Sequence, residues 1–194
     1  DRAQAPGGDL VGVVAECLDA GLPAVQVREK DLGAADLAAL CRRLLSLTRA
    51  RGALLIVNDR VDVALAVGAD AVQRTGTSLP IADIRAVAGM RLRVGASVHS
   101  LDEALSAERA GADWVVFGPV YDTPSKRPYG PPQGLVRLAE TARALRIPVI
   151  AIGGITPARV GEVCEAGARG VAAISAILDV SSPAAATRAF LDAL

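Results

Sequence analysis

Short apolar runs alternate with helical patterns along the whole of this 194-residue chain. The runs carry Val, Ile and Ala at consecutive positions, which is typical of strands covered on both faces in a parallel sheet. They occupy residues 24–29, 54–59, 71–74, 93–99, 114–120, 149–154 and 170–175. Helical patterns fill residues 10–20, 34–51, 61–67, 81–87, 101–110, 134–146, 157–166 and 183–194. This alternation predicts an α/β protein, either a (β/α) barrel or a doubly wound sheet.

The order of these units and the glycine-containing turns between them favour the barrel. A helix comes first, and eight helical patterns accompany seven strand candidates, which indicates that the first strand is missing or truncated at the N-terminus. Gly-Ala-Asp precedes two strands, at 68–70 and 111–113, and Ala-Gly-Ala-Arg precedes another at 166–169. Glycine thus ends a helix and a short turn enters the next strand. We expect residues 1–194 to form one barrel domain.

Charge and composition narrow the class of partner. The chain has 21 Lys and Arg residues and 21 Asp and Glu residues, so its formal net charge is zero. A general attraction to nucleic acid or to an anionic membrane is therefore not expected. The chain has no uncharged apolar stretch of about 18 residues and no signal-peptide core at its start. We expect a cytoplasmic protein with small-molecule partners, and a homo-oligomer stays open. The three cysteines, Cys17, Cys41 and Cys164, are expected to be buried thiols because apolar residues surround them.

Polar residues gather just after the strand candidates. The carboxyl ends of parallel strands meet at one rim of a barrel, and active sites of this architecture lie there. Such a rim would bring together Arg28, Glu29, Lys30, Asn58, Asp59, Ser97, His99, Thr123, Ser125, Lys126, Gly153, Gly154 and Ser175.

The last two strand-to-helix junctions are candidates for a phosphate site. Gly153 and Gly154 close one strand, and Thr156 and Pro157 follow as the expected N-cap and first turn of a helix. Glycines let backbone N–H groups approach a phosphate, and residues 170–177 make a similar junction. The two junctions together are the usual phosphate site of such barrels, although a glycine pair also serves as a plain tight turn.

Cationic and hydroxyl side chains suggest a second anion site. Thr123, Ser125 and Lys126 lie in a long loop whose prolines make it a candidate lid or clamp, and together they suit a diphosphate. Strand alternation points Arg28 and Lys30 to one side, although a solvated, salt-bridged strand end is the alternative.

A metal ligand and an acid–base group are the remaining candidates. Asn58 and Asp59 end the most apolar strand, and Mg²⁺ takes one or two carboxylates together with substrate phosphate. Asp59 could instead be the N-cap of the next helix. His99 is the only histidine, and it either acts as an acid or base or serves as an ordinary hydrogen-bonding group.

The motifs at 25–30, 57–70, 95–100, 111–126, 147–156 and 170–177 resemble the thiamine phosphate synthase/TenI family, in order and at family spacing. The similarity runs from residue 1 to the C-terminus, and Asp1-Arg2 resembles the end of that family's first strand. The resemblance implies a (β/α)8 TIM barrel. It also implies a synthase that uses Mg²⁺ to join hydroxymethylpyrimidine diphosphate to thiazole phosphate and releases pyrophosphate.

The resemblance also implies a role for each matched residue. It puts Gln26 on the pyrimidine and Asp59 on Mg²⁺. The diphosphate is surrounded by Arg28, Lys30, Asn58, Ser97 and Lys126, of which Arg28, Ser97 and Lys126 are the expected catalytic groups. Thiazole phosphate is contacted by Thr123, Gly153, Gly154, Ile174 and Ser175, and we add Ser125 to the substrate-binding set because it lies in the same loop.

Two positions depart from the synthase pattern. Residues 73–78 replace the His-x-Gly-Gln-x-Asp element of synthases and place Ser78 where the second Mg²⁺ carboxylate stands. Ser78 and residues 97–100 resemble the TenI branch, whose role is thiazole tautomerisation. That branch has a histidine where this chain has Pro119, and it lacks Gln26 and Asp59. We predict a synthase; the alternatives are a tautomerase that uses His99 and a non-catalytic binder of thiamine phosphate or thiazole phosphate.

Overall fold

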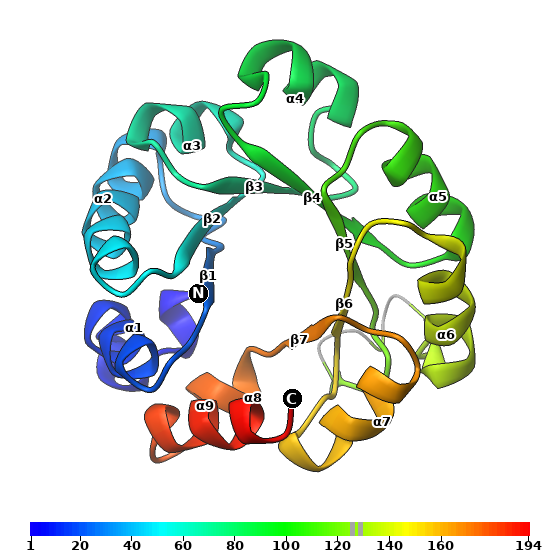
Figure 1. The fold of residues 1–194 in the computed structure, drawn as a ribbon. Helices are drawn as coiled ribbons and strands as arrows, with labels where there is room; N and C mark the ends of the chain where they lie inside the picture. The colour runs from blue at the N-terminus through cyan, green and yellow to red at the C-terminus, as the bar shows by residue number, and fades with distance from the viewer. Residues whose placement is uncertain (125–126, 128–129) are drawn as a thin grey trace.

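The computed structural model describes the whole chain except residues 125–126 and 128–129. Its strands form one sheet in sequence order, each parallel to the next. They are β1 (Ala24–Val27), β2 (Leu54–Asn58), β3 (Ala71–Arg74), β4 (Arg93–Val98), β5 (Trp114–Phe117), β6 (Val149–Ile152) and β7 (Gly170–Ala172). Figure 1 shows the sheet curled into a ring that stays open between β1 and β7. The predicted barrel class is confirmed, and no strand precedes β1 among the described residues.

Helices surround the sheet (Figure 1). They are α1 (Leu10–Asp19), α2 (Ala34–Ala50), α3 (Val61–Val67), α4 (Ile81–Ala88), α5 (Leu101–Arg109), α6 (Gly134–Ala144), α7 (Val160–Glu165), α8 (Ser175–Leu178) and α9 (Pro183–Asp192). The 3-10 turns η1 (Arg2–Gln4), η2 (Pro6–Gly8) and η4 (Pro157–Arg159) complete the described helical elements. The first helix α1 packs against the last helix α9, so the outer layer is continuous where the sheet is open.

The strands alternate between two environments. Val57, Val72, Val94 and Val115 are fully buried, which is expected for side chains covered by the helices. The residues between them face the interior of the barrel, where Gln73 is a buried polar side chain. Leucines of the helices, such as Leu44, complete the core against the outer face of the sheet. The core therefore lies mainly between sheet and helices. The interior face carries half-buried apolar side chains such as Ile56 and Trp114 alongside the polar group of Gln73.

The N-terminal residues differ from the expectation drawn from the sequence. Asp1 and Arg2 resemble a strand end, but Arg2 begins η1, and the Asp1 carboxylate accepts a hydrogen bond from the N–H of Ala3 at 3.0 Å. Arg2 binds Glu29, whose side chain is 2% exposed, through its backbone N–H at 2.6 Å and its guanidinium at 3.6 Å. The segment is therefore anchored beside the end of β1 without joining the sheet.

The three thiols are free, and two are buried as predicted. Burial raises the pKa of Cys41 to about 11 and raises the pKa of Cys17, so neither forms much thiolate at pH 8. We expect the folded protein to react with a thiol-specific dye at Cys164 alone, which is half-buried on α7, and the unfolded protein to react at all three. Rapid labelling of two or more thiols in the folded protein would contradict this packing.

Among the described residues, no helix is both long and apolar enough to cross a bilayer.

Candidate functional site

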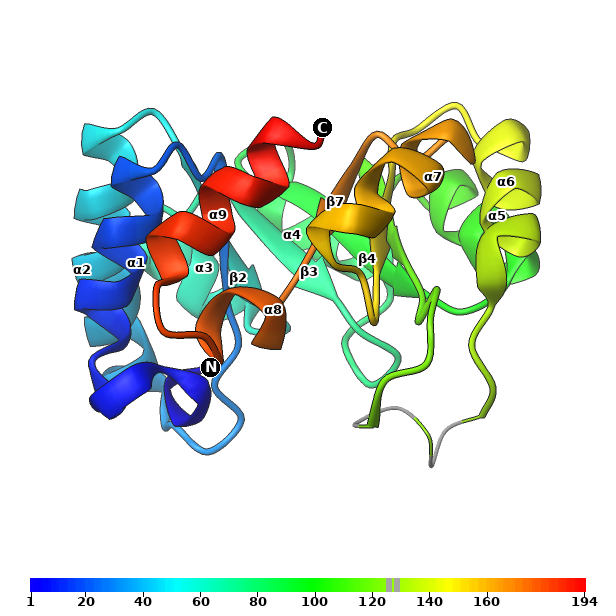
Figure 2. The same ribbon diagram turned by 90° about the horizontal axis from the view of Figure 1, so that it is seen from below.

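The loops that follow the strands lie on one side of the barrel. Figure 2 shows α8 and the loops after β1, β3 and β5 on the side that also carries the N-terminus. This is the carboxyl-terminal rim on which the candidate residues were expected to meet.

A row of side chains crosses the barrel interior just below this rim. Register pairs Asn58 with Gln73, Gln73 with Gly95, and Gly95 with Trp114. Gln26 of β1 reaches the same row, because its side-chain N–H donates to Asn58 Oδ1 at 3.1 Å. Two of the predicted site residues, Gln26 and Asn58, are thus in direct contact.

Ser97 lies two residues beyond Gly95 along β4 and therefore nearer the rim. Its hydroxyl oxygen accepts a hydrogen bond from Gln73 Nε2 at 3.0 Å. Sequence reasoning considered Gln73 only as part of a departing motif and missed this contact. The signal that could have revealed it is a polar residue that follows Ala71 and Val72 inside a predicted strand.

Asp59 follows β2 in an unusual backbone conformation. Its φ is 66°, and among the described residues it is the one non-glycine residue with a positive φ. Helix α3 takes Arg60 as its N-cap residue without a side-chain hydrogen bond, so the alternative that Asp59 caps this helix is wrong. No hydrogen bond to the Asp59 carboxylate is found within the described residues. A half-buried carboxylate held in a sparsely populated conformation at a rim is typical of a functional group.

Ser78 has a local structural role. Its hydroxyl oxygen accepts from the N–H of Thr75 at 2.8 Å and lies 3.0 Å from the Thr75 hydroxyl, and its own N–H donates to Thr75 O at 3.1 Å. These bonds close the turn between β3 and α4. Within the described residues no cluster of three or more His, Cys, Asp or Glu side chains could hold a metal, so Asp59 would hold a metal ion only together with water or substrate oxygens.

The charged residues that follow β1 have different surroundings. Glu29 is directed to Arg2, whereas Arg28 is half-buried and Lys30 is exposed. The two cations therefore do not use Glu29 as their partner, and they remain available for an anion at the rim.

Gly153 and Gly154 make a close approach of two backbones. Their φ angles are 100° and 65°, and a Cβ on Gly153 would lie 2.6 Å from Pro119 Cα. The chain after β5 continues along β6 here, since Val120 N donates to Ile152 O and Tyr121 N donates to Gly153 O. The glycines are thus needed for packing in addition to any ligand.

The same turn leaves backbone donors unused. In the described part of the chain, the N–H groups of Gly153, Gly154 and Ile155 donate to no backbone oxygen. Arg159 Nη1 donates to Gly154 O at 2.7 Å and holds this peptide in place. Ile174 and Ser175 are exposed at the junction of β7 and α8. Because η4 and α8 are short, the backbone N–H groups matter more here than a helix dipole.

Arg159 belongs to a small cluster beside the glycines. Its guanidinium lies over the Tyr121 ring, 4.3 Å from the centroid, and the Tyr121 hydroxyl donates to Glu162. Burial, with the Glu162 carboxylate beside it, raises the pKa of Tyr121 to about 12. Sequence reasoning did not find this cluster, because its members are far apart in the chain.

The long loop is only partly described. Thr123 is half-buried. The exposed side chains of Asp122 and Arg127 form an ion pair. Ser125 and Lys126, two predicted site residues, lie outside the described residues.

His99 is exposed at the end of β4. Its Nδ1 lies 2.5 Å from Gly118 O, and since a carbonyl only accepts, Nδ1 carries the proton. Ser100 caps α5, and the Glu103 carboxylate accepts from the N–H of His99 at 2.7 Å. The ring is therefore fixed at the rim.

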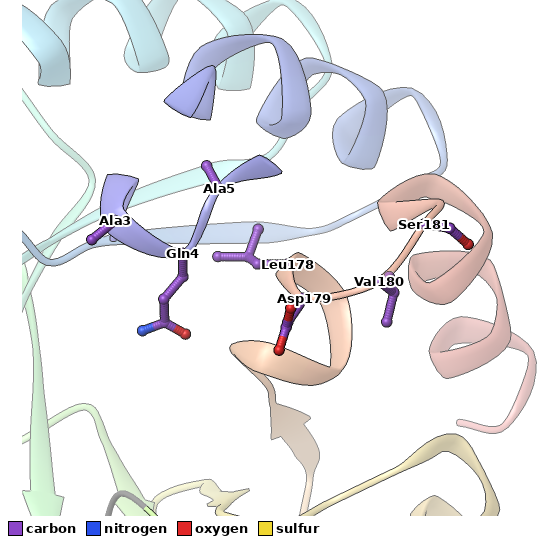
Figure 3. A pocket seen from close by; sticks show the side chains of 7 residues that line it. All are labelled: Ala3, Gln4, Ala5, Leu178, Asp179, Val180 and Ser181. Atoms are coloured by element: carbon purple, nitrogen blue, oxygen red, sulfur yellow. The ribbon is translucent and has the colours of Figure 1, made fainter. Parts of the chain in front are cut away.

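One cavity lies apart from these residues. It has a volume of about 640 Å³ and lies between the N-terminal segment and the α8–α9 connection, at the opening of the sheet (Figure 3). Its lining is Ala3, Gln4, Ala5, Leu178, Asp179, Val180 and Ser181. Because it has no cationic side chain and one carboxylate, it is a poor site for a phosphorylated ligand.

The fold defines a parallel α/β barrel, and the candidate site lies at its carboxyl-terminal face. Residues 1–177 match the model of the family described as thiamine monophosphate synthase. The chain belongs to this family, and the predicted family is confirmed.

Individual relatives agree with this assignment. A thiamine-phosphate synthase of Roseiflexus castenholzii is 46% identical over 192 residues, which are 99% of this chain and 84% of that protein. One from Methanospirillum hungatei is 40% identical over 192 residues, 99% of this chain and 93% of that protein. The solved structure of thiamine phosphate pyrophosphorylase from Pyrococcus furiosus has a TM-score of 0.92 and 38% identity, covering 100% of this chain and 91% of that one.

Proposed function

We propose that this protein is a thiamine phosphate synthase that joins hydroxymethylpyrimidine diphosphate to thiazole phosphate and releases pyrophosphate. Family membership supports this reaction class. The observation that carries it is the group of Gln26, Asn58, Asp59 and Ser97 at the ends of β1, β2 and β4. The Asp59 carboxylate is held in the left-handed region and accepts no hydrogen bond from the described residues.

The protein catalyses this reaction mainly by electrostatic stabilisation of the leaving diphosphate. The bond between the pyrimidine methylene carbon and the diphosphate oxygen breaks, and its electron pair leaves with the diphosphate. The thiazole nitrogen lone pair then forms the new C–N bond. Preorganised donors aimed at the leaving oxygens lower this barrier, and a closed site keeps water from the short-lived cation. Arg28, Lys30, Asn58, Ser97 and Lys126 are the groups we assign to this task.

Magnesium is part of the proposal. Asp59 supplies one carboxylate, and Mg²⁺ in proteins is commonly held by one or two carboxylates together with waters and substrate phosphate oxygens. The Ser78 hydroxyl already accepts from Thr75, and it contributes no charge. The donor set therefore suits a metal ion that arrives with the diphosphate. When bound, Mg²⁺ would neutralise charge that builds up on the leaving group.

The second substrate is assigned to the other side of the rim. The N–H groups of Gly153 and Gly154, which donate to no backbone oxygen of the described residues, suit a phosphate monoester. Thr123 lies on the loop after β5, and Ile174 and Ser175 lie at the start of α8. We also propose a cytoplasmic location. A homo-oligomer stays a prediction, as does the single domain over residues 1–194.

One observation supports an alternative reaction. In the neutral ring of His99, the Nδ1–H that binds Gly118 O leaves Nε2 without a proton at the rim, so this nitrogen could move a proton on a thiazole carboxylate phosphate. This tautomerase would work without Mg²⁺ and would lose activity in His99→Ala. A protein that binds thiamine phosphate or thiazole phosphate without turnover is the third possibility.

The purified protein, given both substrates and Mg²⁺, should form thiamine phosphate and pyrophosphate in equal amounts, measured by chromatography. Chelation of Mg²⁺ should stop both products. If thiamine phosphate is absent and the thiazole tautomer converts in the presence of chelator, the tautomerase takes the place of the synthase. Binding without either reaction would leave only the regulator.

A further inference from the structure

The amide of Gln73 is an unusual group for the interior of this barrel. The residue is 1% exposed, and its Oε1 is buried without a hydrogen-bond partner within the described residues. Leaving a buried acceptor unsatisfied destabilises a fold, and an apolar side chain of the same length would avoid this. Stability alone therefore does not explain a glutamine at this position.

The surroundings hold the amide in one place. Gly95 is its register partner on β4, and a Cβ there would lie 2.3 Å from Gln73 Oε1 and 2.2 Å from Trp114 Cε2. The missing side chain at 95 thus makes room for the amide oxygen and the indole together. With Oε1 against Gly95, the amide nitrogen is directed to Ser97 Oγ at 3.0 Å.

This contact determines how the Ser97 hydroxyl can act. A serine hydroxyl has one proton to donate and two lone pairs to accept. Gln73 Nε2 occupies a lone pair, so the Ser97 proton remains free for another acceptor. The diphosphate oxygens are acceptors only, and they need a donor from Ser97. If the amide were reversed, Ser97 would donate to Gln73 and present lone pairs to the anion.

We infer that Gln73 is a positioning residue that fixes the Ser97 hydroxyl as a hydrogen-bond donor to the substrate diphosphate. The inference rests on the proposed synthase activity, in which Ser97 contacts the leaving group. Gln73 itself lies one layer below the rim and acts only through Ser97.

Two substitutions separate this role from simple packing. Gln73→Met keeps the length of the side chain and removes both polar atoms, and it should fold because it also removes the unpaired oxygen. Gln73→Glu keeps the shape but offers only acceptors when ionised, so Ser97 would donate to it instead. Thermal melting of each variant checks the fold.

The experiment is a steady-state kinetic cycle with wild type, Gln73→Met, Gln73→Glu, Ser97→Ala and the Gln73→Met/Ser97→Ala double variant. We expect each Gln73 variant to lose about 5- to 10-fold in kcat, the effect of one hydrogen bond, with both KM values within about twofold. In the Ser97→Ala background, Gln73→Met should cost less than about twofold, because the two residues act as one unit.

Three results would overturn the inference while the wild type makes thiamine phosphate: unchanged kcat in Gln73→Met, full activity in Gln73→Glu, or the same loss from Gln73→Met with and without Ser97. A wild type that makes no thiamine phosphate would instead remove the proposed function. The two failures are therefore distinguishable from one set of assays.

Discussion

Replacing Asp59 by asparagine should lower kcat/KM for thiamine phosphate formation by about 100-fold, since a carboxylate that holds Mg²⁺ near the leaving group is worth several kcal/mol of charge stabilisation. Asparagine is the right replacement because it tolerates the left-handed backbone, where Asp59 has a φ of 66°. The free energy of unfolding should then change by less than about 0.5 kcal/mol, as for a surface substitution without structural partners. Activity and chemical denaturation are measured on the same preparation.

The exposed Asp83 on α4 provides the matched control for this prediction. Asp83→Asn makes the same chemical change at an exposed helical residue that is not among the predicted site residues, and it should keep wild-type activity. In Asp59→Asn, the Mg²⁺ concentration for half-maximal rate should rise as well. Full activity of Asp59→Asn with an unchanged Mg²⁺ requirement would show that Asp59 is not a metal ligand.

The strained backbone at Asp59 leads to a prediction about stability. Glycine takes positive φ without the Cβ penalty, so Asp59→Gly should be no less stable than wild type although it removes the carboxylate. A substitution that keeps or improves stability and abolishes activity is expected where the fold holds a residue in place for chemistry.

The strands were predictable because their pattern is set by burial on both faces. Each predicted run contains an observed strand. The strand β3 has the predicted bounds, but the others are shorter: 24–29 became Ala24–Val27 and 114–120 became Trp114–Phe117. The apolar pattern continues past the sheet because Val120 packs in the core while its segment follows β6 outside the strand. Hydrophobicity reports burial, and burial extends beyond the paired residues.

The site was predictable in its position but not in its contacts. The rule that strand ends share a rim predicted that Asn58 and Ser97 lie on one face, and Gln26 was added by the family resemblance. The link between Gln73 and Ser97 depends on a register in which Gly95 leaves room for an amide, and no local pattern encodes that. Helix α8 was missed because its four residues are too few for a periodic signal.

The second large effect is a loss of stability, expected at the turn formed by Gly153 and Gly154. Gly153→Ala should destabilise the fold by about 3 kcal/mol or more, which combines a strained backbone and an overpacked contact. The φ of Gly153 is 100°, and the new Cβ would lie 2.5 Å from Pro119 Cβ and 2.6 Å from Pro119 Cα. Because Pro119 meets it with backbone atoms, no side-chain rotation can relieve the contact. The melting temperature should fall by about 6 to 12 °C.

Gly161→Ala tests whether this loss comes from the environment of Gly153 rather than from glycine replacement itself. Gly161 lies in the first turn of α7, and a Cβ there meets nothing within 4 Å. Alanine favours the helix, so this variant should gain about 0.5 kcal/mol. The residual folded Gly153→Ala protein should also bind thiazole phosphate more weakly, with the pyrimidine diphosphate KM little changed, since its displaced N–H groups lie on the thiazole side. Equal stability of the two variants would mean that the loop after β5 does not press on Gly153, and the donors of this turn would then be free to move with their ligand.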